Sequence, residues 1–435
     1  MWNVDPKLVV ITVFLLTYLW VILFYHWKTQ IVWAAVVVLV AFKLLSPEQA
    51  LASVNWNVIL LYFGMLFVSE TFLYSKVPDY LATLFASKAP SVRVAMVILC
   101  AFTGCLSVVL ENVAVVLLVA PIALAISKKC GISPVPLFIG MAISSNLQGA
   151  ATLIGDPPSM LLAGYAKLSF NDFFVIDGKP SMFFAVQVGA LVSVLVLYLL
   201  FRKYNTKLPP LEKAPYDSLV PAVLVLLLVG ALALSSSFQH GEHGVSYMAG
   251  LLCCLFGAIC FVWYLWHSRA RKVAEFLSKL DWQTGLFLMG IFILVESLSV
   301  AGVMGDLANL IVRVSGSSPL FVYCLVVWVS VGISAFVDNV PFLVAMLAVT
   351  RMLIEQTGLP PHLLYFGLLL GASVGGNVTP IGASANIVAM GIVRKQGHET
   401  TFGEFVKIGL PFTVASVLAS SLFVWFVFRV SGTGK

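Results

Sequence analysis

Apolar segments long enough to cross a membrane recur along this chain and leave little room for another architecture. Such runs lie near 8–26, 31–46, 57–74, 181–201, 218–236, 245–266, 282–299 and 405–429. Hydrophobic residues make up 60% of the 435 residues and charged residues only 10%, against about 25% charged residues in soluble proteins. The spans must be helical, because a transmembrane barrel shows alternating residues instead of long apolar runs. We therefore expect an all-α polytopic membrane protein with about 10 transmembrane helices.

Several other classes are disfavoured by the same composition. The run 8–26 is interpreted as a true span and not a signal peptide, because its leading charge is weak and no small-residue cleavage site follows. The seven cysteines show neither a disulfide framework nor metal-ligand spacing, so no metal site is predicted. No nucleophile–base pair is visible, so an enzyme is not expected. The net charge of +6 is assigned to membrane orientation, and nucleic-acid binding is not predicted.

Four apolar stretches are interrupted by polar residues. The runs 93–127 and 318–350 are broken by "LEN" at 110–112 and "VDN" at 337–339. Each side of such a break, about 17 residues, reaches only about 25 Å as a helix. We predict re-entrant hairpins here, with two tilted, kinked helices as the alternative. The stretches 136–166 and 361–393 are predicted to be broken helices, with "SSNLQGAATLIGDPP" and "SVGGNVTPIGASAN" at their breaks.

The two halves of the chain resemble each other at a nearly constant offset. Trp56, Gly64 and Glu70 each match a residue 226 positions later, namely Trp282, Gly290 and Glu296. Glu111-Asn112 matches Asp338-Asn339, and "TLIGDPPS" at 152–159 matches "TPIGASAN" at 379–386, all 227 positions later. One offset that changes by a single residue over a whole half indicates a tandem duplication.

Five crossings in each half would insert the second copy upside down relative to the first. This is the inverted repeat of secondary transporters. We predict a first repeat at 1–201, a basic cytoplasmic linker at 202–217 and a second repeat at 218–435. With both termini outside, most of the 25 Lys and Arg residues, Lys28 among them, fall on the inner side.

Non-helical backbone at membrane depth is tolerated only where protein or water covers it, so the four breaks are expected to meet around one site. Three groups of candidate residues follow. The predicted substrate-binding residues are Asn112, Asn146, Thr152, Asn339, Asn377, Thr379, Ser384 and Asn386. The predicted ion- or proton-coupling residues are Glu111, Asp156 and Asp338. The predicted hinge residues are Gly149, Gly155, Pro157, Pro158, Gly376, Pro380 and Gly382.

Charge narrows the expected chemistry of this site. Acids inside a membrane are costly and usually functional, and no Lys or Arg is expected beside these three. A core with acids and no fixed cation favours protons or metal cations over a strongly anionic substrate. Asp156 is the first choice for the coupling residue, because its counterpart in the second half is Ala383. No cofactor is predicted, apart from a bound sodium ion or a transported proton. Glu70 and Glu296, near span ends, are weaker candidates.

The motifs "ENVAVVLLVAP", "GAATLIGDPPS", "VDNVPFLVAMLAV" and "GGNVTPIGASANIVAMGI" resemble the ion transporter superfamily. The similarity runs from about residue 50 to 425. It is greatest to the branch with arsenite permeases, NhaD-type sodium/proton antiporters and the melanosomal P protein, which share a citrate-transporter-like domain. The resemblance implies opposed hairpins, a scaffold and a mobile transport domain, and a homodimer with an elevator motion. Position 111 departs from it, with Glu where many relatives have Asp or Asn, and position 159 has Ser where P-protein-like motifs have Asn.

The preferred hypothesis is a proton-coupled secondary transporter that exports arsenite or antimonite. A sodium/proton antiporter, a carboxylate or anion permease and a passive anion channel of the same fold remain alternatives. The expected substrate is a small inorganic ion or a small oxyacid, and the expected membrane is a prokaryotic plasma membrane. No phosphate-binding loop is visible in the sequence, so any ATPase would be a separate subunit.

Overall fold

Helices make up nearly all of this computed structural model, which describes residues 5–210, 214–237, 247–268, 273–316 and 318–429. Residues 211–213 of the predicted linker therefore lie outside the described part. The first half contains α1 (Pro6–Leu23), η1 (Tyr25–Trp27), α2 (Lys28–Ala41), α3 (Pro47–Ser53), α4 (Trp56–Tyr74), α5 (Val77–Ala86), α6 (Val92–Ser107), α7 (Asn112–Cys130), α8 (Val135–Gly149), α9 (Pro157–Ala166), η2 (Asn171–Phe173), β1 (Val175–Ile176), β2 (Lys179–Pro180), α10 (Met182–Leu200) and η3 (Phe201–Lys203).

The second half contains α11 (Val220–Ser237), α12 (Met248–His267), α13 (Val273–Lys279), α14 (Trp282–Val300), α15 (Val303–Ser315), α16 (Pro319–Ser334), α17 (Asn339–Thr357), α18 (Pro361–Gly375), η4 (Gly376–Val378), α19 (Ser384–Lys395) and α20 (Phe402–Phe428). In the described residues, 9 helices are long and apolar enough to cross a membrane. The polytopic helical class is thus confirmed. The two-residue strands β1 and β2, paired antiparallel, and the short helices α3, α5, α13 and α15 were not expected from the sequence.

Helix bounds repeat between the halves. Helix α4 spans Trp56–Tyr74 and α14 spans Trp282–Val300, which is a shift of 226 at both ends. Helix α7 spans Asn112–Cys130 and α17 spans Asn339–Thr357, which is a shift of 227 at both ends. Similar sequences thus produce the same local structure twice, including a helix break at each predicted hairpin tip. The opposed orientation of the halves and the depth of the tips in the membrane stay predictions.

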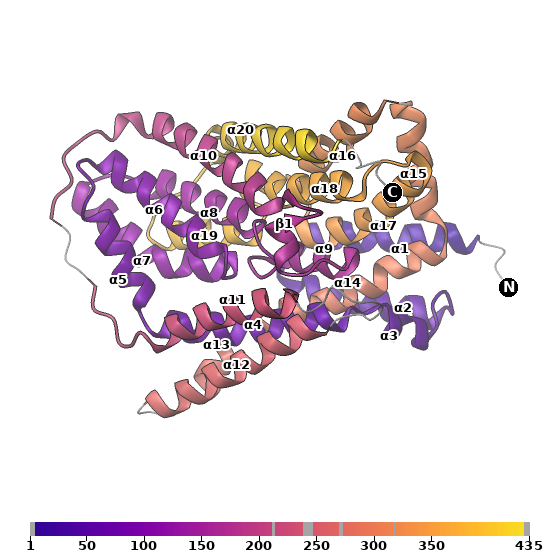
Figure 1. The fold of residues 1–435 in the computed structure, drawn as a ribbon, viewed down its shortest axis with the longest axis horizontal. Coiled ribbons are helices and arrows are strands. Elements are labelled where there is room, and N and C mark those ends of the chain that lie inside the picture. Colours follow the sequence, from indigo (N-terminus) through magenta and orange to yellow (C-terminus); the bar gives the residue numbers. More distant parts are fainter. Residues whose placement is uncertain (1–4, 211–213, 238–246, 269–272, 317, 430–435) are drawn as a thin grey trace.

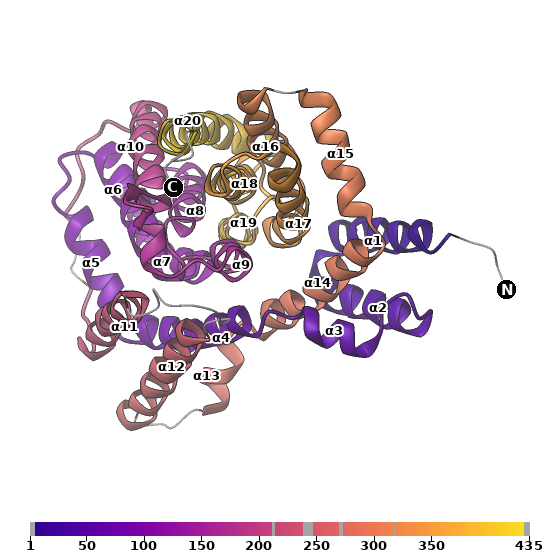
Figure 2. The same cartoon turned by 45° about the vertical axis from the view of Figure 1, so that its right-hand side comes forward.

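Packing between the halves is reciprocal. Helix α4 packs on α12 while α14 packs on α2, and α9 packs on α17 while α19 packs on α7. The last helices of the two halves, α10 and α20, pack on each other and lie side by side in both views (Figures 1 and 2). Each copy is therefore completed by the other, and neither half forms a separate domain with its own core.

Figure 2 shows two layers. Helices α6–α10 and α16–α20 form one bundle, and α1–α4 with α11–α14 form a wall along its side. The breaks in the bundle face this wall, where α9, α17 and α14 come together. The division brings the polar breaks to a boundary between two helical layers, and this boundary is where the candidate site lies.

Candidate functional site

The two broken helices end and restart inside the bundle. Helix α8 ends at Gly149 and α9 begins at Pro157, where two prolines occupy the first turn and the Asp156 side chain caps it. Proline suits a first turn because its missing N–H is not needed there. In the second half, α18 ends at Gly375 and α19 begins at Ser384. The helix ends leave backbone N–H and C=O groups without helical partners inside the bundle, where a polar ligand can use them.

Glycine lets each break approach the hairpin tip of its own half. A methyl group added at Gly149 would lie 2.5 Å from Asn112 Oδ1, and one at Gly376 would lie 2.8 Å from Asn339 Oδ1. Both distances are shorter than real contacts of a Cβ atom, so any larger residue would push the tip away. The predicted hinge glycines thus act as spacers for the two tip asparagines.

Hydrogen bonds within each tip, and between each tip and its break, repeat in both halves. Ser334 Oγ donates to Asn339 Oδ1 at 2.6 Å, and Ser107 donates to Asn112 in the equivalent place. Thr152 Oγ1 donates to the Val108 carbonyl, and its counterpart Thr379 Oγ1 donates to the Ala335 carbonyl. These repeated contacts make each tip and its break one polar unit inside the bundle.

A second set of hydrogen bonds crosses between the halves, and its members are all buried. Asn146 Nδ2 on α8 donates to Asn377 Oδ1 at 2.8 Å and to Asn386 Oδ1 at 3.1 Å. Ser373 Oγ on α18 donates to Asp156 Oδ2 at 3.0 Å. Asn146 and Ser373 are equivalent positions in the two copies. Both donate a hydrogen bond to the opposite half, but Asn146 bonds to amide oxygens and Ser373 bonds to a carboxylate.

A cavity of about 60 Å³ lies where the tips and breaks meet the wall. Its lining residues come from both tips, both broken helices, α2 and the start of α14. They are Lys28, Glu111, Asn112, Val113, Asn146, Asp156, Pro157, Pro158, Asp281, Thr284, Phe287, Asp338, Asn339, Val340, Ala383, Ser384 and Ala385. A cavity of this size can hold a few water molecules. The cavity therefore suits a small polar species in this conformation.

The structure divides the predicted substrate-binding residues into two groups. Asn112, Asn146, Asn339 and Ser384 line the cavity. The remaining four, Thr152, Asn377, Thr379 and Asn386, are buried or nearly so and bond to protein groups around it. Their amides and hydroxyls hold the broken backbone in place, so they support the cavity from behind.

All three predicted coupling acids line the cavity, and each caps a helix. Glu111 Oε2 accepts from Ala114 N at 3.0 Å, Asp156 Oδ1 from Ser159 N at 3.1 Å, and Asp338 Oδ1 from Val340 N at 3.1 Å. A carboxylate at a helix N-terminus is stabilised by the exposed N–H groups and by the helix dipole. Each acid thus has one oxygen held by backbone and another available for a neighbour.

The expectation of a core without basic residues was wrong. From the sequence we expected Lys28 in the inner loops, but it is the first residue of α2 and lines the cavity. Only 8% of its surface is exposed. Its Nζ lies 3.7 Å from Asp338 Oδ2. A lysine at the edge of an apolar run usually reaches the membrane interface, but the packing of α2 on α14 turns this one inward.

Sequence reasoning also missed Asp281, Thr284 and Phe287, which bring α14 to the cavity. Asp281 caps α14 by accepting from Thr284 N at 3.1 Å. The available signal was its place directly before the duplicated Trp282, where the first half has Asn55 before Trp56. In the described part of the chain, Glu111, Asp156 and Asp281 form no ion pair, so these acids are not neutralised as Asp338 is.

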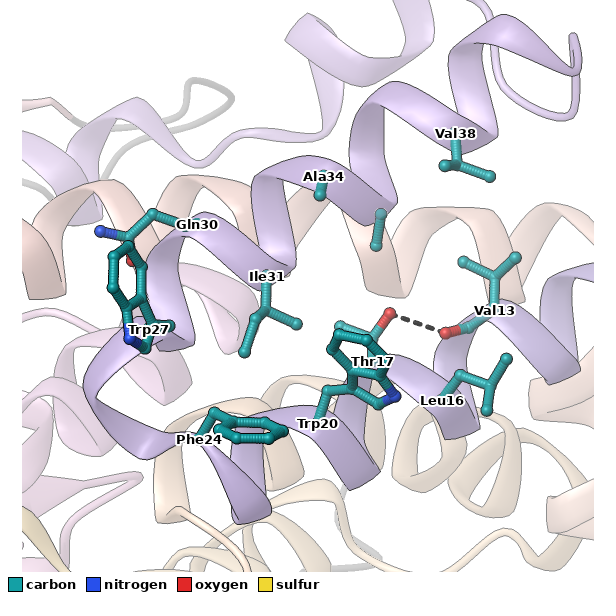
Figure 3. A pocket seen from close by; sticks show the side chains of 11 residues that line it. Val13, Leu16, Thr17, Trp20, Phe24, Trp27, Gln30, Ile31, Ala34 and Val38 are labelled. Atoms are coloured by element: carbon teal, nitrogen blue, oxygen red, sulfur yellow. Dashed lines mark hydrogen bonds between the residues drawn. The ribbon is translucent and has the colours of Figure 1, made fainter.

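A larger hollow of about 730 Å³ lies between α1 and α2 (Figure 3), but its lining differs in kind. The side chains of Trp20, Phe24 and Trp27 surround it, and the Thr17 hydroxyl donates a hydrogen bond to the Val13 carbonyl at 2.6 Å. No charged side chain is among its lining residues in the described part of the chain. It therefore offers a surface for hydrocarbon, and the polar cavity is the candidate transport site.

A family model described as "Citrate transporter" matches residues 18–351 and, in a second overlapping match, residues 244–434. The chain belongs to this citrate transporter family. Two matches that overlap agree with a family in which the halves resemble each other. The predicted resemblance to the citrate-transporter-like branch of the ion transporter superfamily is thus confirmed, and the chain is a membrane transporter.

Similar proteins agree with this family. An uncharacterized transporter of Mycobacterium tuberculosis is 31% identical over 86% of this chain and 86% of its own length. The human P protein is 27% identical over 83% of this chain, which spans 52% of that longer protein. The solved YdaH transporter of Alcanivorax borkumensis has a TM-score of 0.58 and 13% identity, covering 97% of this chain and 98% of its own. That last likeness establishes the fold only.

Proposed function

We propose that this member of the citrate transporter family is a proton-coupled secondary transporter that exports arsenite or antimonite. The observation that carries the proposal is the small cavity at the meeting point of both tips and both breaks, with amides and carboxylic acids in its lining. Arsenite and antimonite are compact trihydroxides, largely uncharged near neutral pH. Such a solute needs hydrogen-bond partners and no fixed cation, and the amide side chains of Asn112, Asn146 and Asn339 line the cavity.

Proton coupling is assigned to Glu111 and Asp156. Both carboxyl groups line the cavity, and no lysine or arginine of the described residues forms an ion pair with either one. A carboxyl group in such a place takes up and releases a proton as its access to the two sides of the membrane alternates. A large tricarboxylate is less suited to this site, because the volume of about 60 Å³ is too small and Lys28 is already beside Asp338.

A sodium/proton antiporter is the second candidate. The acids Glu111, Asp156 and Asp281 give the cavity an excess of negative charge that favours a small cation. The same residues then bind sodium and protons in alternation. A passive channel of this fold is the third, and it differs from the other two by having no coupling at all.

The proposal extends to the setting of the transporter. Relatives in Mycobacterium support a prokaryotic plasma membrane, and the distribution of Lys and Arg supports both termini outside. A homodimer with an elevator motion, and a separate ATPase subunit in cells that use one, complete the proposal. The division into a bundle and a wall in Figure 2 is compatible with such a motion.

Flux into proteoliposomes distinguishes the candidates. The purified full-length chain is reconstituted, a pH gradient is imposed, and metalloid, sodium and proton movements are measured in separate arms. Accumulation of arsenite or antimonite above its equilibrium level, abolished by a protonophore, is the expected result. Sodium-dependent proton movement without metalloid flux would select the antiporter, and flux that only dissipates gradients would select the channel.

A further inference from the structure

The cavity is lined by a lysine from the wall and an acid from the bundle, and these two residues form an ion pair. Lys28 is the first residue of α2, and Asp338 is the residue before α17, at the second hairpin tip. Their charged atoms are 3.7 Å apart, with side chains 10% and 13% exposed. The Lys28 ammonium also lies 4.8 Å from the centre of the Phe287 ring on α14, a cation–π contact. The Lys28 ammonium is thus held by a carboxylate and an aromatic face, and it is largely buried.

The two oxygens of Asp338 have different tasks. Oδ1 accepts from Val340 N at 3.1 Å and so fixes the tip's own backbone. Oδ2 faces Lys28 and so ties the tip to a helix of the wall. Helix α2 packs on α1 and α14, whereas α17 packs on α18, α15 and α9 as well as on α14. The ion pair therefore spans the boundary between bundle and wall, which a moving tip must cross.

Among the described residues, the equivalent tip in the first half forms no ion pair with a lysine or arginine of the wall. Glu111 caps α7 as Asp338 caps α17, with Oε2 accepting from Ala114 N at 3.0 Å. The wall residue that shares the cavity with it from the start of α14 is another acid, Asp281. One duplicated acid is thus neutralised by a fixed cation and the other is not. The duplication places both acids, but only the surrounding wall makes them different.

We propose that the Lys28–Asp338 pair is a latch that holds the second tip closed against α2. It opens when a proton or a transported cation replaces the lysine at Asp338 Oδ2. The proposal rests on the proposed function, because it assumes that the chain is a coupled carrier. A buried ion pair is costly to break unless one charge is neutralised. The latch therefore keeps the site closed as long as Asp338 is charged and paired with Lys28, and it limits the passage of protons on Glu111 and Asp156 when no cargo is bound.

The surroundings of Asp338 are consistent with this exchange. The titratable groups that line the hollows on either side of it are Lys28 on α2, Tyr18 on α1, Asp281 before α14, and Glu111 and Asp156 across the cavity. The Tyr18 hydroxyl is buried and has no hydrogen-bond partner among the described residues. It lines a small hollow behind Asp338. This hydroxyl is a ready partner for the acid once the lysine has left.

The test compares four full-length proteins in proteoliposomes: wild type, Lys28→Met, Asp338→Asn and the double variant Lys28→Met/Asp338→Asn. The matched control is the double variant Lys76→Met/Asp217→Asn, which removes an exposed pair 3.1 Å apart outside the cavity. Melting temperature reports the fold. A trapped pH dye reports proton leak under an imposed pH gradient, with no metalloid and no sodium gradient present.

We expect each single variant to melt several degrees lower than the wild type, because one buried charge is left unpaired. The double variant should recover most of that loss, since both charges are gone. Its proton leak should nevertheless rise by about tenfold or more, because the tip now opens without cargo. The control pair should change neither quantity. A folded double variant with the wild-type leak would overturn the latch.

Chemical rescue keeps the proposal testable if the double variant does not fold. Lys28→Cys is treated with an aminoethyl methanethiosulfonate reagent, which restores an ammonium group, or with the methyl reagent, which does not. The treated wild type corrects for the seven native cysteines. Leak suppressed by the aminoethyl reagent alone supports the latch, and leak unaffected after complete labelling refutes it. Because this readout uses protons only, it stays distinct from the metalloid arm, where failure of the proposed function would show.

Discussion

Replacing Asp156 by asparagine should abolish gradient-driven transport and leave the fold nearly intact. Asp156 is buried, with Oδ1 accepting from Ser159 N at 3.1 Å and Oδ2 accepting from Ser373 Oγ at 3.0 Å. Asparagine caps helices about as well as aspartate, so the start of α9 should hold. A hydrogen bond to a charged group is worth about 1 kcal/mol more than a neutral one, so the expected loss of stability is roughly 1 kcal/mol. The asparagine amide, however, cannot carry a proton through the transport cycle.

Asp156→Ala is the informative comparison. It removes the cap, which is worth about 1 kcal/mol. It also leaves the buried Ser373 hydroxyl without its acceptor, which costs about 1–3 kcal/mol. The sum of roughly 2–4 kcal/mol should appear as a clear drop in melting temperature, whereas Asp156→Asn should melt close to the wild type. If Asp156 had only a structural role, transport activity would follow stability, and Asp156→Asn would transport better than Asp156→Ala.

The assay measures melting temperature and pH-driven uptake in proteoliposomes for both variants, at equal protein content. Uptake at the level of empty liposomes for Asp156→Asn, with a near-native melting temperature, is the expected result. Retained accumulation above equilibrium by the asparagine variant would remove Asp156 from the coupling mechanism. The proton would then have to travel on Glu111, the other predicted coupling acid that forms no ion pair with a described residue.

Three further predictions concern the fold and its orientation. Gly64→Leu should lower the free energy of unfolding by about 3 kcal/mol or more, because its Cβ would lie 2.5 Å from a backbone nitrogen of α12. Gly230→Leu is the control, because nothing lies within 4 Å of a Cβ at that position. Melting curves in detergent compare the two variants. Asn146→Ala should lower stability by about 2–3 kcal/mol by removing two hydrogen bonds between the halves, and an unchanged melting temperature would contradict this. Cysteines at Asn339 and Asn112 should react with impermeant reagents from outside and inside respectively, and the reverse pattern would invalidate the inverted topology.

The asymmetry between the two tips has a simple physical origin. Duplication gave both halves a helix break, a capping acid and a tip asparagine, and these local features persist in both copies. The wall residues around the two tips differ, so that a lysine reaches one acid and an aspartate shares the cavity with the other. A single pocket can then assign different roles to two acids of common origin.

The sequence by itself determined the spans, the duplication and the four breaks. Hydrophobic length fixes a membrane helix locally, glycine and proline stop a helix wherever they fall, and a repeated pattern is visible as a constant offset. Nearly every apolar helix therefore lies where its run predicts it. The acids Glu111, Asp156 and Asp338 could be singled out for the same reason, since a charge inside an apolar run is visible without a structure.

The tertiary structure alone decided which side chains face the cavity. Lys28 and Asp281 sit at the ends of apolar runs, where sequence predicts an interface, and only the packing of α2 on α14 across the two halves brings them inside. Asn377 and Asn386 stand in a predicted site motif, yet they bond to the other half and to broken backbone. At a helix break the side chains follow no period, so their direction is set by the neighbours they meet, and some of those neighbours lie more than 200 residues away in the chain.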